Sequence, residues 1–125
     1  LIWDAEGKKY ATNDATPELI EELIDELNND THTMVALDLR GQASMIVSGG
    51  KDGRVRVNYV PEDLEKPTRH LLDHTMDNST IQLTMNGKLS TYKMIHTVSK
   101  DVAEQALISV LQTRTFDEAL DWLDD

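Results

Sequence analysis

The chain has 125 residues, a formal net charge of -11 at pH 7 and no cysteine. This length suits one domain, residues 1–125, which buries about two-thirds of its unfolded surface. The lack of cysteine excludes disulfides, thiolate metal sites and a cysteine nucleophile, and it fits a reducing cytosol. No apolar run in the sequence is long enough for a membrane span. We expect a cytoplasmic domain, trimmed at its front because it begins at Leu1 without Met.

A hairpin and a helix are predicted in the first 30 residues. Residues 1–3 and 9–12 flank the turn dipeptide Glu6-Gly7, as the two strands of a hairpin would. Thr16 and Pro17 then suit the cap and the first position of a helix. Its apolar stripe consists of Leu19, Ile20, Leu23, Ile24 and Leu27. Its opposite face is acidic, with Glu21, Glu22, Asp25 and Glu26.

Three antiparallel strands, 34–40, 43–48 and 54–60, are predicted next. Apolar and polar residues alternate in the first and third of them, which is the period of a strand with one buried face. Glycine-rich turns separate the strands, the longer one at 49–53. The apolar face of this meander needs a cover, which we expect the helices to supply.

The second half begins irregularly and then becomes ordered. Pro61, Pro67 and the charges between them argue against a regular element in the first half of 61–79. Alternation in 80–95 around Asn86-Gly87 predicts a hairpin that adds two strands to the sheet. A second helix is predicted from Ser99, with its apolar stripe along 102–111. Residues 115–118 resemble a capping box that opens a short helical turn, and an extended tail ending on Trp122 is the competing assignment.

These elements predict an α+β fold, with an antiparallel meander sheet of about five to seven strands covered on one face by two helices. One shared core is expected to contain Leu19, Ile20, Leu23, Val35, Leu37, Val55, Val57, Val102, Ala106 and Leu107.

Candidate catalytic residues are few. His70 and His74 have the spacing of two metal ligands on one helix face, with Asp73 and Asp77 nearby. The segment lacks the glutamate that follows the first histidine in zinc hydrolases of this type, so ordinary surface or partly buried histidines are the competing interpretation. There is no Gly-x-Ser-x-Gly elbow, and residues 49–53 lack the ending of a phosphate-binding loop. We therefore expect a binding protein without cofactor or metal, and a small metal-dependent hydrolase is the alternative.

The negative charge is concentrated in residues 1–30 and 115–125. This balance disfavours nucleic acid as a partner and favours a basic protein, although an acidic surface can also serve solubility alone. A generic acidic adaptor is therefore a third possibility. We expect the binding residues first in the irregular middle segment, because loops on a rigid scaffold commonly carry recognition, and second in the tail. The middle set is Glu62, Asp63, Glu65, Asp73 and Asp77. The tail set is Asp117, Glu118, Asp121, Trp122, Asp124 and Asp125.

The order of these elements resembles a family of immunity proteins from bacterial polymorphic toxin systems, the Imm family numbered one. The likeness is carried by the strand Ala36-Leu37-Asp38-Leu39, the hairpin 45–60 with its Gly-Gly break, Val98-Ser99 before the helix 102–111, and the closing Trp122. The resemblance implies an immunity protein that binds a toxin domain and occludes its active site. It further implies a toxin that is a nucleic-acid deaminase, otherwise a nuclease, with a basic cleft, in a 1:1 complex without nucleic acid or membrane.

Overall fold

The computed structural model describes residues 1–115 and 117–124. Over these residues the helices are α1 (Pro17–Asp25), α2 (Lys100–Thr113) and the short 3-10 helix η1 (Met94–His96). The strands are β1 (Ile2–Ala5), β2 (Lys8–Ala11), β3 (Met34–Leu39), β4 (Ala43–Lys51), β5 (Arg54–Pro61), β6 (Arg69–Leu71), β7 (Thr80–Met85), β8 (Lys88–Lys93), β9 (Val98–Ser99) and β10 (Trp122–Asp124). Within the same residues, no helix is long and apolar enough to cross a membrane.

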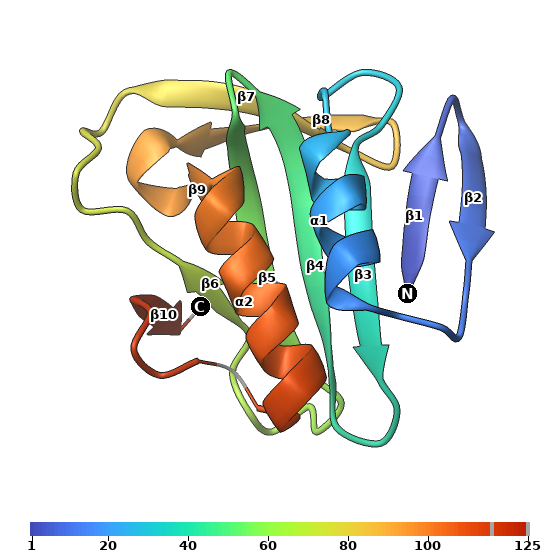
Figure 1. The fold of residues 1–125 in the computed structure, drawn as a ribbon. Coiled ribbons are helices and arrows are strands. Elements are labelled where there is room, and N and C mark those ends of the chain that lie inside the picture. Colours follow the sequence, from blue (N-terminus) through green and yellow to red (C-terminus); the bar gives the residue numbers. More distant parts are fainter. Residues whose placement is uncertain (116, 125) are drawn as a thin grey trace.

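A large antiparallel sheet forms the centre of the molecule (Figure 1). Its strand order is β10-β6-β5-β4-β3-β1-β2, and β9 pairs with the start of β5 to make eight strands in the described residues. The predicted α+β class and the meander of β3, β4 and β5 are confirmed. The sheet exceeds the predicted five to seven strands, because three-residue β6 and β10 and two-residue β9 are too short to show a period in the sequence.

Both helices cover one face of this sheet, as predicted (Figure 1). Each starts at a residue whose side-chain oxygen accepts a backbone N–H: Thr16 from Leu19 at 3.1 Å, and Ser99 from Val102 at 3.4 Å. The predicted core is confirmed, with Leu19 and Val102 packed at its margin and the other eight residues buried. Alternation along the strands is what directs these side chains toward the helices.

The hairpin of β7 and β8 is placed differently from the prediction. It forms a separate two-stranded sheet and crosses the face of the main sheet opposite the helices (Figure 1). Asn29 holds it there, because its side chain donates to the Gln82 carbonyl at 3.3 Å and accepts from the Thr84 N–H at 2.6 Å. Ile81 and Leu83 are buried beneath it. A period of two shows that a strand has a buried face but not which sheet buries it, so the sequence could not assign this hairpin.

Four other boundaries also differ from the sequence interpretation. β4 continues through both glycines to Lys51, so the turn is Asp52-Gly53 rather than 49–53. β8 ends at Lys93, and η1 follows it. The middle segment contains β6. The competing assignment for the tail is correct: Trp122–Asp124 is a strand paired with β6, while Phe116 and Asp125 lie outside the described residues.

Leu37 tests the assignment of the buried face. It is 3% exposed and faces the helices. Leu37→Ala should lower the free energy of unfolding by about 2–5 kcal/mol, because the substitution removes buried methyl groups and leaves a cavity. Asp38→Ala, at the exposed neighbouring position, is the matched control and should change it by less than about 0.5 kcal/mol. Denaturant titration measures both, and a cost below about 1 kcal/mol for Leu37→Ala would contradict the assignment.

Candidate binding surface

The acidic residues of the middle segment fall into two groups at opposite ends of β5. Glu62, Asp63 and Glu65 follow the Pro61 end, whereas Asp73 contacts Arg54 at the other end. β5 has eight residues, so its ends are roughly 23 Å apart at about 3.3 Å per residue. The structure therefore does not bring the predicted middle set together as one cluster.

The group after Pro61 lies on an exposed loop. Glu62 is tied to the β3–β4 turn, since its carboxylate accepts the Gly41 N–H at 3.1 Å. Asp63 accepts the N–H of Glu65 at 3.0 Å and so shapes the loop. Between them Leu64 is 96% exposed, the most exposed large hydrophobic side chain of the described residues. Leu64 therefore contributes nothing to the core, and a single exposed apolar side chain of this kind is common on protein surfaces.

Asp73 has a structural task. Its carboxylate pairs with buried Arg54 at 2.9 Å, and Arg54 also donates to the Thr97 hydroxyl at 3.1 Å and to the Thr97 carbonyl at 2.7 Å. Hydrogen bonds from Thr75, together with Arg54, hold the pKa of Asp73 below its usual value against the opposing effect of burial. A buried guanidinium without its carboxylate is costly, so Asp73 belongs to the fold rather than to a free binding surface.

Asp77 serves a local turn in a similar way. Its carboxylate accepts the Ser79 hydroxyl and, at 2.9 Å, the Ser79 N–H. These hydrogen bonds lower the pKa of Asp77 from its ordinary value. Asp77 therefore fixes the entry into β7, although its exposure leaves its carboxylate open to solvent.

His70 and His74 do not share one helix face, because His70 lies in strand β6. His70 is buried, and its Nε2 is 2.7 Å from Nδ1 of His96. His74 is exposed and contacts the carboxylate of Asp121. Within residues 1–115 and 117–124, no group of three or more His, Asp or Glu side chains is arranged to hold a metal ion.

The tail closes one edge of the main sheet. β10 pairs with β6, and Trp122 packs edge-on against Tyr59 with ring centroids 6.4 Å apart. The indole N–H donates to the Asp117 carbonyl at 2.8 Å, and Asp124 pairs with Arg69 at 3.0 Å. Of the predicted tail residues, Trp122 and Asp124 thus secure the strand, Glu118 is exposed, and Asp125 lies outside the described residues.

The helix layer gathers more negative charge than the middle loop. Its carboxylates come from both helices and include Glu18, Glu21, Glu22, Asp25, Glu26, Asp101 and Glu104. Lys100 is the cation within this layer, and its Nζ donates to the carbonyls of Asp25 and Leu27 at 2.9 Å and 2.6 Å. The carboxylates of α1 and α2 are therefore left largely without neutralising partners.

This excess of negative charge contributes to a raised pKa of Glu104. Burial raises its pKa to about 8, together with a hydrogen bond to Asp25 and the charges of Asp25, Asp101 and Glu21. Its Oε1 is buried and has no hydrogen-bond partner in the described part of the chain. Glu104 therefore carries a proton near neutral pH, where ordinary glutamates are ionised.

A pH dependence of stability follows from Glu104. Its pKa is raised from 4.5 to about 8 on folding, so the folded state retains a proton that the unfolded state loses between these values. Stability should therefore fall as pH rises from 5 to 8. Glu104→Gln keeps the neutral form and should flatten this dependence, which denaturant titrations at several pH values between 5 and 9 would measure. Equal slopes for both proteins would contradict the assignment.

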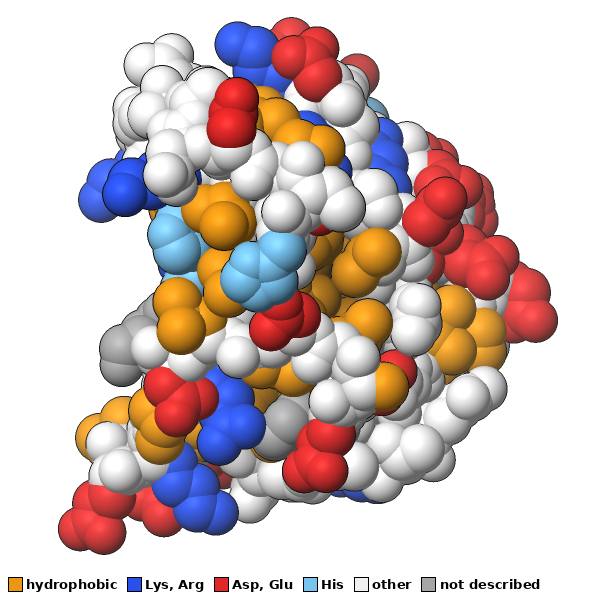
Figure 2. All heavy atoms as spheres, turned by 90° about the vertical axis from the view of Figure 1, so that its left-hand side faces the viewer, with side chains coloured by type: hydrophobic (Ala, Val, Ile, Leu, Met, Phe, Trp, Pro, Cys, Tyr) orange, Lys and Arg blue, Asp and Glu red, His pale blue; other side chains and the backbone are white. Residues whose placement is uncertain are grey.

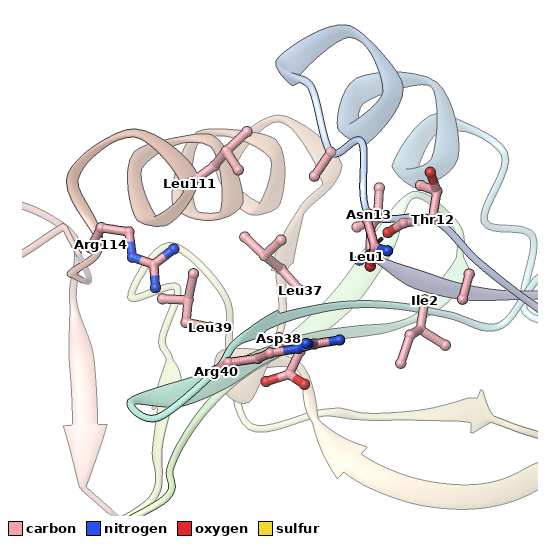
Figure 3. A pocket seen from close by; sticks show the side chains of 12 residues that line it. Leu1, Ile2, Thr12, Asn13, Leu37, Asp38, Leu39, Arg40, Leu111 and Arg114 are labelled. Atoms are coloured by element: carbon pink, nitrogen blue, oxygen red, sulfur yellow. Dashed lines mark hydrogen bonds between the residues drawn. The ribbon is translucent and has the colours of Figure 1, made fainter.

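A cavity of about 390 Å³ lies at the lower end of the sheet, between α2 and the first hairpin (Figure 3). Figure 3 shows Leu37 and Leu39 pointing toward Leu111 of α2, whereas Asp38 points away from the helix. The guanidinium of Arg114 stands at one side of this space. The lining combines core side chains with the polar side chains Thr12, Asn13, Asp38, Arg40 and Arg114. Because Asp38 points away from the helix, its carboxylate does not converge with Arg114 as the polar groups of a typical small-molecule site do.

The face opposite the helices is the feature that the sequence analysis missed. Strand register brings one row of side chains together on it, since directly opposed residues share a face of a sheet. We call this the outer row; it consists of Ile2, Ala36, Ile46, Asn58, His70 and Leu123. Two of its members, Ile2 and Leu123, are 37% and 41% exposed. Only the pairing of six strands reveals this row, which is why no local pattern indicated it.

Neither the protein-family models nor the curated proteins compared with this sequence give a match.

Proposed function

We propose that this protein is an immunity protein that binds and neutralises a cognate bacterial toxin domain. The observation that carries the proposal is the accumulation of carboxylates on α1 and α2, whose charges add to the effect of burial in raising the pKa of Glu104 to about 8. A surface of this kind attracts a cationic protein and increases its rate of association. The resemblance in element order to the Imm family numbered one supports the same partner class.

The proposed partner is a toxin that acts on nucleic acid, a base deaminase first and a nuclease second. Such a toxin needs a basic cleft for phosphates, and an acidic protein of net charge -11 complements that cleft. The proposed action is occlusion of the toxin's active site in a 1:1 complex in the cytoplasm. Binding, rather than catalysis by His70 and His74, is proposed because the first contacts His96 and the second contacts Asp121.

Co-expression tests the proposal directly. The toxin encoded beside this chain should arrest growth when expressed alone and should be tolerated when this chain is present. The purified proteins should also form a stable complex in a pull-down. Growth arrest that persists at full expression of this chain, with no complex, would remove the proposal.

The loop after Pro61 is the proposed charged part of the contact. Glu62→Lys together with Glu65→Lys should weaken toxin binding by about 1–3 kcal/mol, since reversed charges meet a cationic surface. Glu6→Lys with Asp14→Lys is the matched control, because it changes the net charge equally at exposed positions outside both the loop and the two helices. Calorimetry at low and high salt measures both. An equal effect of the two double variants would show that net charge alone matters and that the loop is not in the contact.

A further inference from the structure

The face of the sheet that carries the outer row is the one opposite the helices. In Figure 2 the helix layer faces right, and the left-hand outline is hollowed below the β7–β8 hairpin. The hairpin covers the sheet only toward the Arg54 end of β5, where Arg56 lies over the ring of Tyr92 at 4.7 Å. Ala36, Ile46 and Asn58, farther along their strands, remain half-buried. As formed by residues 1–115 and 117–124, the second layer of this face is therefore incomplete.

β8 has an unpaired edge. The two-residue turn Asn86-Gly87, with both φ angles positive, makes Met85 and Lys88 a hydrogen-bonded pair. Hydrogen bonding to β7 then alternates along β8, so Leu89, Thr91 and Lys93 direct their backbone groups to the other side. In the described residues, neither another strand nor a side chain hydrogen-bonds there.

The two edges of the hairpin are unlike each other. The outer edge of β7 is bonded by the Asn29 side chain at Gln82 and Thr84, as the same alternation requires. No described residue caps the edge of β8 in this way. It can therefore accept a strand, whereas that of β7 is already satisfied at its centre.

We propose that the partner binds by adding an extended segment to the free edge of β8, so that this segment lies over the outer row. This inference rests on the proposed function, since it takes the toxin as the partner. Backbone hydrogen bonds to Leu89, Thr91 and Lys93 would supply affinity, and alternate side chains of the segment would pack on the outer row. A strand in this position completes the second layer.

The chemistry of the surface defines the occupant. The unpaired N–H and C=O groups of β8 require an extended backbone, and Ile2, Ile46 and Leu123 require apolar residues at every second position. The net charge of -11 opposes a second copy of this chain as the occupant. Lysines at both ends of β8, Lys88 and Lys93, also discourage indiscriminate pairing of edges.

Thr91→Pro tests the proposal with the complete chain and the toxin encoded beside it. Proline removes the outward N–H of Thr91 but keeps the hydrogen bonds to β7, and its ring blocks an incoming strand. We expect the affinity for the toxin to fall at least roughly tenfold, which is the equivalent of one lost backbone hydrogen bond. Lys9→Pro is the matched control, because Lys9 occupies the corresponding outward position on β2, at the far edge of the main sheet. It should leave affinity unchanged.

Hydrogen exchange of the unmodified proteins tests the same inference without relying on the proline variants to fold. In the complex the amides of Leu89, Thr91 and Lys93 should exchange at least tenfold more slowly than in the free chain. A complex in which these amides exchange at the free rate, or in which Thr91→Pro and Lys9→Pro bind equally, would overturn this inference and leave the proposed function standing. A free chain that dimerises through β8 in sedimentation analysis would also overturn it. Absence of any complex would overturn both.

Discussion

Both layers of the molecule meet at one glycine pair in β4. A Cβ on Gly50 would lie 2.5 Å from the backbone of Leu27, which follows the end of α1, and a Cβ on Gly49 would lie 2.8 Å from Leu83 of β7. Their φ angles of 110° and 105° are likewise disfavoured for residues with a side chain. The helix layer and the hairpin can approach the same strand from opposite sides because neither glycine has a side chain. The register shift in β4 at this point is the local result.

The burial of Arg54 is a second constraint, and it gives one of the acidic residues, Asp73, a structural role that the others do not have. Arg54 is 8% exposed and requires the Asp73 carboxylate and Thr97 as partners, which fixes the chain between β6 and β7 against the start of β5. Asp63 and Asp77 shape turns through their own neighbours. A stretch with one uniform acidic composition thus contains residues with quite different roles. Negative charge left unpaired by folding lies mainly on α1, α2 and the loop after Pro61.

The sequence indicated the parts of the fold that follow from local periodicity. Thr16 and Ser99 marked the helix starts, and alternation along β3 and β5 identified the buried side chains correctly. The sequence could not show that the β7–β8 hairpin leaves the main sheet. Ile81 and Leu83 would be buried equally well if the hairpin extended the main sheet or packed across its face. The outer row was also beyond reach, since Ile2 and Leu123 are brought onto one face only by the pairing of strands distant in the sequence. The histidine spacing would have indicated a pair of metal ligands only if both residues lay on one helix, and His70 lies on a strand.

The Asn29 side chain has a consequence for assembly. Its amide occupies the centre of one edge of the two-stranded sheet, with a positive φ of 65° at Asn29 that directs the amide there. Sheet growth is thereby made unidirectional: a strand can join at β8, but none can continue the ladder beyond β7. Stacking of successive molecules edge to edge needs two open edges per sheet. With one edge closed from within, this hairpin can terminate another protein's sheet but cannot propagate one into a fibre.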